Sequence, residues 1–181
     1  MRVIDETTIS ETRKWLERAV IGLNLCPFAK AVLVRQQIRW VVSHAESEAG
    51  LLEQLKGELL VLAGADERHF ETTLLIHPAV LTDFLQYNSF LARAERALEK
   101  QGLEGVLQIA SFHPDYCFSG SRPDDVSNNS NRSPYPMLHL LREESIERAV
   151  QAFPDSARIY ERNIATLNEL GVEGWNNLWI D

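Results

Sequence analysis

The amino-acid sequence predicts a single α/β or α+β layered domain in which helices pack on a four-stranded mixed sheet. Apolar runs of strand length alternate along the chain with segments whose apolar residues recur at helical spacing. A chain of 181 residues has the usual length of one domain with a sizeable core. The expected order is αββαβαβαα, whose two strand–helix–strand units can form right-handed crossovers. We therefore expect residues 1–181 to fold as one domain.

The first expected element is a helix whose start carries a capping signal. Thr8 and Glu11 match the pattern in which a hydroxyl and a glutamate satisfy free backbone N–H groups. Apolar residues then recur at helical spacing from Trp15 to Leu23, and Pro27 closes the segment.

Strands and helices alternate through the middle of the chain. The short polar segment 35–37 separates two strand-like runs and allows a hairpin between them. Thr82 is placed to cap a long amphipathic helix that ends before Gly102. The expected strands cover residues 31–34, 38–43, 72–77 and 106–111, and the first of the two helices among them covers residues 47–63.

Two helices complete the expected fold, at about 137–152 and 155–170. Pro154 is well placed to start the last helix, because a proline costs least in the first turn. The tail GWNNLWID carries two tryptophans that we expect to pack back on the body of the domain.

Composition narrows the classes of function. The formal net charge of −8 argues against a nucleic-acid binder, which relies on a basic face. The longest apolar runs are far too short to span a membrane, and the charged first ten residues do not resemble a secretory signal. Two cysteines do not make a disulfide framework, so we expect free thiols in a cytoplasmic protein. The oligomeric state and any cofactor are left open.

The polar segment 112–136 is where we expect the function to lie. It holds four of the seven prolines, and Val126 is its one aliphatic residue. A connection this long in a compact domain is usually functional or disordered. Disorder is the weaker interpretation, because the segment also contains histidine, cysteine and aromatic side chains that bury or react.

His113 and Asp115 are candidates for an acid/base pair just past the end of an expected strand. Ligands of open α/β sheets bind beyond the carboxyl ends of strands, and a carboxylate can orient an imidazole base. The structural alternative is a His113 that packs against the sheet and bonds a loop carbonyl. His77 ends another expected strand, and it shares this edge if the two strands run parallel.

Arg132 and Ser133 are candidates for binding an anion. Ser133 is a suitable N-cap and Pro134 a suitable first residue for the expected helix. Helix N-termini present free N–H groups, and an arginine beside one adds a bidentate donor for carboxylate or phosphate. The alternative is an ordinary capped helix with a surface arginine.

Acidic and amide side chains fill the middle of the same segment. Asp124 and Asp125 can bind a divalent cation or anchor an arginine, although such pairs also form turns. Asn128 and Asn131 can contact a ligand, although asparagine equally suits tight turns.

The cysteines offer two further possibilities. Cys26 lies between a helix end and an expected strand, where a thiol activated by a base is a nucleophile. The negative end of the helix dipole works against a thiolate there, and free cysteines are often simply buried. Cys117 and His113 have a spacing that can ligate zinc, but two ligands do not make a site.

Two longer stretches resemble a known bacterial family. They are ETRKWLERAVIGLNLCPFAKAV near the start and PDDVSNNSNRSPYPMLHLLREESIERAV later in the chain. The combination of CPFAK, FHPDY and NRSPYP is similar to the family catalogued as domain of unknown function 1415. The resemblance covers nearly the whole chain and implies a small, stand-alone cytoplasmic protein, with no established activity to carry over.

Three hypotheses for the function follow. The first is an enzyme that acts on a small anionic or polar metabolite, with His113 and Asp115 as acid and base and Arg132 holding the anion. The second is a non-catalytic binding or regulatory module that uses the same segment, and the third is a metal-binding protein. The common motifs of P-loop, Rossmann, zinc-protease and serine-hydrolase sites are absent from the sequence.

Overall fold

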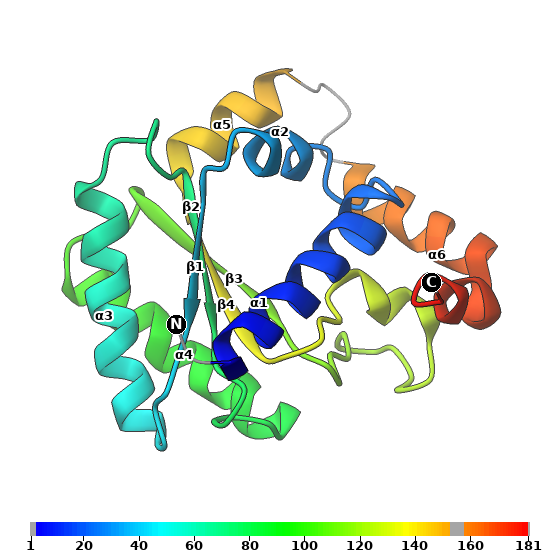
Figure 1. Ribbon diagram of the computed structural model, residues 1–181, viewed down its shortest axis with the longest axis horizontal. Coiled ribbons are helices and arrows are strands. Elements are labelled where there is room, and N and C mark those ends of the chain that lie inside the picture. Colours follow the sequence, from blue (N-terminus) through cyan, green and yellow to red (C-terminus); the bar gives the residue numbers. More distant parts are fainter. Residues whose placement is uncertain (1–2, 153–157, 181) are drawn as a thin grey trace.

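The computed structural model describes residues 3–152 and 158–180, which form one sheet with helices on both faces. The chain begins with helix α1 and a π-helical turn η1, and a short helix α2 precedes the first strand (Figure 1). The elements are α1 (Val3–Trp15), η1 (Leu16–Ile21), α2 (Ala29–Val34), β1 (Ile38–Val42), α3 (Glu48–Gly64), β2 (Thr72–Ile76), α4 (Phe84–Lys100), β3 (Leu107–Phe112), the 3₁₀ turn η2 (Val126–Ser130), β4 (Met137–Arg142), α5 (Glu143–Ala152) and α6 (Ile159–Asn177).

The sheet has four strands in the order β1-β2-β4-β3. β1 and β2 are parallel, and β4 runs antiparallel to both of its neighbours. β1, β2 and β3 therefore share one direction, and their carboxyl ends lie at the edge where β4 begins. The expectation of a four-stranded mixed sheet in a layered α/β fold is confirmed.

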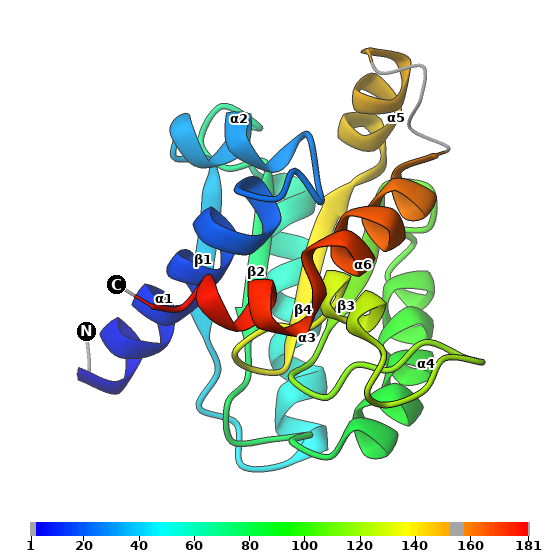
Figure 2. The ribbon, with the colours of Figure 1, turned by 90° about the vertical axis from the view of Figure 1, so that its right-hand side faces the viewer.

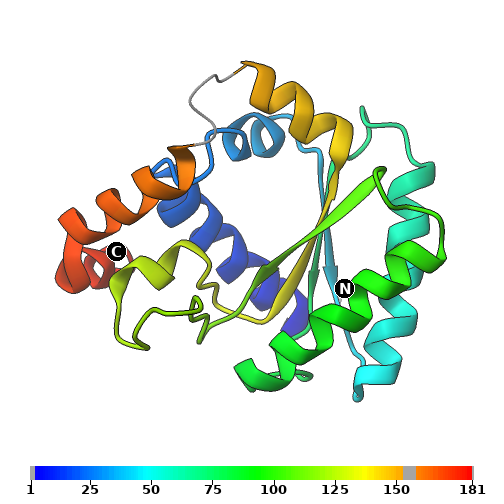
Figure 3. The ribbon, with the colours of Figure 1, turned by 180° about the vertical axis from the view of Figure 1, so that it is seen from behind.

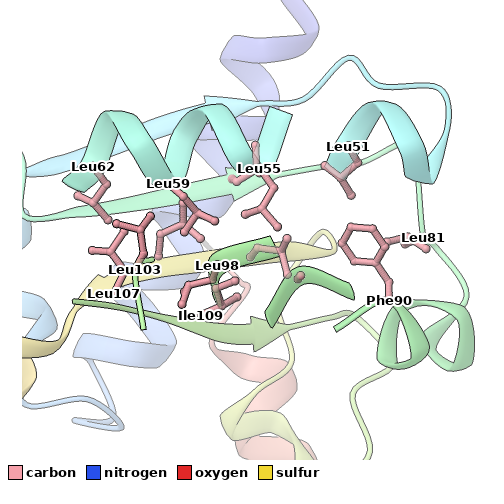
Figure 4. Close-up of a cluster of buried hydrophobic side chains, with 14 of the residues drawn as sticks. Leu51, Leu55, Leu59, Leu62, Leu81, Phe90, Leu98, Leu103, Leu107 and Ile109 are labelled. Atoms are coloured by element: carbon pink, nitrogen blue, oxygen red, sulfur yellow. The ribbon is translucent and has the colours of Figure 1, made fainter. Parts of the chain in front are cut away.

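Helices α3 and α4 cover one face of the sheet, and α1 lies against the other (Figures 1 and 3). The first core cluster lies under α3 and α4, where four leucines of α3 meet α4, β3 and β4 (Figure 4). The four leucines are Leu51, Leu55, Leu59 and Leu62, spaced so that one helical stripe faces the sheet.

The second core cluster joins α1 and η1 to the opposite face of β2 and β4. Its buried members are Trp15, Leu16, Ala19, Val20, Leu74, Ile76 and Met137. The two tryptophans of the tail, Trp175 and Trp179, pack against this cluster from α6 and its end. The expectation that the tail returns to the body of the protein is therefore met.

The expected strand at 31–34 is wrong, because these residues belong to helix α2. Ala29 and Leu33, one helical turn apart, pack against the second cluster, while the Val34 side chain is 71% exposed. A short apolar run is ambiguous between strand and helix until its packing partners are known. The expected hairpin with β1 is absent for the same reason, and β1 pairs with β2 instead.

The expected helix over 137–152 is also wrong in its first half, where the chain forms β4. Leu138 and Leu140 face the first cluster and Met137 faces the second, so both faces of this central strand carry buried apolar residues. A strand buried on both faces has a continuous apolar run that resembles a buried helix. The helix proper, α5, begins at Glu143.

Two helix boundaries also differ from the expectation. α4 is capped by Asp83, whose side chain accepts a hydrogen bond from the backbone N–H of Gln86, rather than by Thr82. α6 extends well past residue 170, with Gly171 at a φ of 66° where the helix is interrupted. Pro154 lies outside the described residues. No helix of the described chain is both long and apolar enough to cross a membrane.

The Tyr87 hydroxyl joins β3 and β4 at the edge where the long loop starts, so we expect Tyr87→Phe to destabilise the fold. It donates to the Met137 carbonyl at 2.8 Å and accepts from the Phe112 N–H at 3.0 Å. Its loss leaves two backbone groups without this partner, at a cost of about 1–3 kcal/mol of unfolding free energy. Urea denaturation measures this loss, and Tyr160→Phe, at a mostly exposed tyrosine, is the matched control. Equal stability of the two variants would contradict the assigned role.

Candidate functional site

His77 and His113 lie at the same edge of the sheet, on either side of Tyr87. β2 and β3 are both antiparallel to β4 and so run parallel to each other, which is the condition for a shared edge. The centroid of the Tyr87 ring is 5.8 Å from that of His77 and 5.1 Å from that of His113. The three rings form a packed cluster beneath the loop.

Both ring nitrogens of His113 bond the backbone. Nδ1 accepts from the Asp115 N–H at 3.0 Å, so Nε2 carries the proton and donates to the Leu81 carbonyl at 3.2 Å. The residue is fully buried, and desolvation lowers the pKa of its imidazole. Asp115 contacts the ring through its main chain, and its side chain is exposed. This geometry matches the structural alternative for His113 and gives no oriented acid/base pair.

Asn128 is the centre of the loop between β3 and β4. Its buried side-chain oxygen accepts from the Phe118 N–H at 3.0 Å and from the Ser121 hydroxyl at 2.7 Å. Its side-chain nitrogen donates to the Arg122 carbonyl at 2.8 Å. The asparagine therefore satisfies backbone groups across the loop, which is the architectural role that asparagine often has in turns.

Arg132 ties the two halves of the loop together. Its Nε donates to the Tyr116 carbonyl at 3.1 Å and one Nη donates to the Pro123 carbonyl at 2.6 Å. The other Nη lies 3.4 Å from the side-chain oxygen of Asn129. A guanidinium has five N–H donors, so two remain after these contacts. No carboxylate of the described residues forms an ion pair with Arg132.

The remaining polar candidates of the loop mostly bond within it. The Asp124 carboxylate pairs with Arg122 at 2.8 Å, and Asp125 caps η2 by accepting from the Ser127 N–H. Asn131 donates to the Ser111 carbonyl at 3.1 Å. The acidic side chains therefore anchor an arginine and form a turn, and the amide bonds the backbone, as the structural alternatives to ligand binding predicted.

Ser133 does not cap a helix, which corrects the expectation of an anion-binding helix start there. The segment after it enters β4, and the Ser133 hydroxyl donates to the Tyr135 carbonyl at 2.7 Å. The pairing of β4 with both β2 and β3, with Met137 and Leu138 fully buried at its start, determines this local structure in spite of the Ser-Pro capping signal.

The two cysteines are free thiols with different surroundings. Cys26 packs against the second core cluster, and desolvation raises the pKa of its thiol, which disfavours the thiolate. Cys117 contacts the Ser121 hydroxyl at 3.5 Å within the loop. Over residues 3–152 and 158–180, no three His, Cys, Asp or Glu side chains gather as a metal site would require.

A cavity of about 820 Å³ lies between the loop, α1 and α6. These three segments lie side by side on the sheet face opposite α3 and α4 (Figures 1 and 2). Arg132, Ser133 and Asp124 line the cavity, whereas His77, His113 and both cysteines do not. Its lining residues are Glu11, Lys14, Trp15, Pro114, Asp124, Val126, Asn129, Arg132, Ser133, Pro134, Val172, Trp175, Asn176 and Trp179.

Three of the chain's four tryptophans form apolar walls of this cavity. Trp15 is almost fully buried, and its indole N–H donates to the Arg132 carbonyl at 2.8 Å. Trp175 and Trp179 are partly exposed and meet edge to face, with centroids 5.5 Å apart. Sequence reasoning expected the tail tryptophans to pack on the body of the domain but did not place them in a cavity lining.

Two walls of the cavity, the loop and α1, each carry one cationic and one anionic side chain. Arg132 and Lys14 supply positive charge from the loop and from α1. Glu11 accepts a hydrogen bond from the Tyr135 hydroxyl, and Asp124 is paired with Arg122. The two acidic side chains thus already have hydrogen-bond donors, whereas Arg132 keeps two donors for another partner.

Comparison with known proteins gives one match. The model of a family described as protein of unknown function (DUF1415) matches residues 7–177. Neither the curated proteins nor the solved structures contain a match to the chain.

We expect the unfolding free energy to fall as the pH drops from about 6.5 to about 4 because of His77. This ring is 1% exposed, its Nδ1 donates to the Val80 carbonyl at 2.8 Å, and its Nε2 is buried without a partner. Burial lowers its pKa from 6.5 to about 4, so in this window the unfolded chain binds the extra proton and the folded chain does not. The difference corresponds to roughly 3 kcal/mol, present in full above pH 6.5 and lost toward pH 4.

Urea denaturation between about pH 7 and about pH 4 measures this contribution. His77→Asn keeps a donor for the Val80 carbonyl and has no titrating ring, so its stability should depend less on pH. Identical pH profiles for the variant and the unmodified protein would show that His77 does not contribute.

Proposed function

Because the chain belongs to the DUF1415 family, whose function is unknown, we propose a function from its cavity. The protein binds a small organic anion between loop 113–136, α1 and α6. The observation that carries the proposal is Arg132, a cation without an ion-pair partner among the described residues, in the lining of an aromatic-walled cavity.

The chemistry of Arg132 favours a carboxylate or phosphate as the anionic group. A planar guanidinium with two N–H groups still available can hold two oxygens at once. The backbone bonds to Tyr116 and Pro123 hold the guanidinium in place. A donor that is already ordered loses little conformational entropy on binding.

The tryptophan walls favour an anion that also carries a flat apolar group. Trp175 on α6 and Trp179 just after it are partly exposed in the cavity lining, and Trp15 of α1 lines the same cavity. Large aromatic faces in a concave site contribute apolar burial and stacking. A volume of about 820 Å³ falls in the range of small-molecule sites.

The same observations favour a binding protein over the acid/base enzyme suggested by the sequence. His113 and Asp115 do not line the cavity, and both nitrogens of His113 bond the backbone. The net charge of −8 supports a small ligand rather than nucleic acid. The two free thiols fit a reducing cytoplasm.

Benzoate is the probe that tests this proposal, because it combines a carboxylate with a flat ring. We expect it to change the tryptophan fluorescence saturably, since three of the four tryptophans line the cavity. Benzyl alcohol has the same ring without the charge and should bind at least about tenfold more weakly, because a charge-assisted hydrogen bond contributes about 1.5–3 kcal/mol. Equal affinities would overturn the assignment of an anion site.

Two variants separate the cation from the aromatic wall. Arg132→Lys should weaken benzoate binding by about tenfold, because a lysine lacks the planar fork. Arg122→Lys, on the same loop and outside the cavity lining, is the matched control and should bind as the unmodified protein does. Trp175→Leu changes a residue of α6 and not of the loop, and it should also weaken benzoate binding, so the test does not depend on the loop's tolerance of a change at Arg132.

A further inference from the structure

The half of the sheet formed by β3 and β4 is only partly covered on the side of α1 and α6. Ala110 and Phe112 of β3 and His139 and Leu141 of β4 are all partly exposed on this face. On the same face of β2, Leu74 and Ile76 are buried in the second cluster. Solvent therefore reaches the middle of the sheet beside β4.

His139 lies on this partly exposed face, and only one of its two ring nitrogens is hydrogen-bonded. The Thr72 hydroxyl lies 2.6 Å from Nε2 of His139 and donates to the Leu140 carbonyl, also at 2.6 Å. A hydroxyl has a single proton, so Thr72 can only accept from the ring, and the proton of His139 is on Nε2. Nδ1 then carries the lone pair, and it has no hydrogen-bond partner among the described residues.

The ring is partly exposed and lies among apolar residues of the neighbouring strands. Solvent reaches it, yet desolvation lowers its pKa from 6.5 to about 4, and no charged group contributes to that shift. The imidazole is therefore neutral at physiological pH. Its neighbours in the sheet are Ala110 and Leu74, with the Phe112 ring 6.2 Å away between centroids.

We propose that His139 is the hydrogen-bond acceptor of a second binding site, over β3 and β4, for a neutral apolar ligand that presents one hydroxyl group, such as a phenol. A lone pair in an apolar environment accepts a hydrogen bond from an O–H group and repels an anion. Among the described residues no group of three potential metal ligands includes His139. Thr72 is the positioning residue, because it fixes the proton on Nε2 and keeps Nδ1 open. The site does not depend on the cavity of the proposed function, whose lining excludes His139.

Diethyl pyrocarbonate tests whether Nδ1 is accessible and neutral. An unprotonated ring nitrogen attacks one of its carbonyls, and ethyl carbonate leaves. Acetylhistidine in the same solution should react roughly eightfold more slowly at about pH 5.5 than at about pH 7, since most of its rings become protonated. Labelling of His139, measured by mass spectrometry, should change by less than about twofold over this range.

The exposed His69 shows that the reagent reaches the protein. The proposal is overturned if His69 is labelled and His139 is not. It is also overturned if the labelling rate of His139 falls between about pH 7 and about pH 5.5 as much as that of acetylhistidine. Thr72→Val removes the acceptor of the Nε2 proton, so the neutral ring can also carry its proton on Nδ1 and labelling of His139 at about pH 7 should be slower.

Phenol tests the ligand class. We expect phenol at ten times its Kd to slow the labelling of His139 by at least about tenfold, because only about a tenth of the sites then remain empty. The labelling rate of His69 should not change. Ala110→Leu fills the space beside His139 and should abolish this protection, whereas Gln108→Leu, exposed on the same face of β3, should retain it. Absence of protection in the unmodified protein overturns the phenol site without reference to either variant.

Discussion

The antiparallel pairing of β3 with β4 is the constraint on which the rest of the structure depends. The two strands are neighbours whose ends, Phe112 and Met137, pair directly, and a turn of about two residues would suffice to join such strands. The chain instead uses residues 113–136, and the extra length reaches out to α6 and builds one wall of the cavity. The sheet thus fixes both ends of the loop, and the length of the loop lets it form one wall of the cavity.

A loop of this length stays ordered because its polar side chains satisfy its own backbone. Asn128 and Arg132 together bond backbone groups of four residues, from Tyr116 to Pro123. Such bonds offset the conformational entropy of ordering the segment. The polar density that suggested catalysis in the sequence therefore has a structural cause, and only side chains with bonds to spare, Arg132 above all, remain for a ligand.

The sequence predicted the layered fold, the mixed four-stranded sheet, and the loop as the place of interest. It misassigned residues 31–34 and the start of 137–152, because a short apolar run does not reveal which faces its neighbours will bury. The same error produced the helix start at Ser133. The aromatic walls could not be predicted from the sequence, since Trp15 and Trp175 line one cavity only after α6 has packed on η2. Arg132 was predicted as the neighbour of a helix start at Ser133, and although that helix does not form, the arginine side chain lines the cavity.

Three histidines near the sheet differ in whether their hydrogen bonds leave a ring nitrogen available to a ligand. Desolvation lowers the pKa of all three, so each ring favours its neutral form. In His113 both nitrogens are used by the backbone, and in His77 the free nitrogen is sealed in the interior. In His139 the bond to Thr72 leaves a nitrogen that solvent can reach. The three residues thus share the same side chain and the same neutral state. The solvent-accessible lone pair of His139 is what distinguishes it, as a proposed ligand-binding residue, from the two histidines that only pack in the fold.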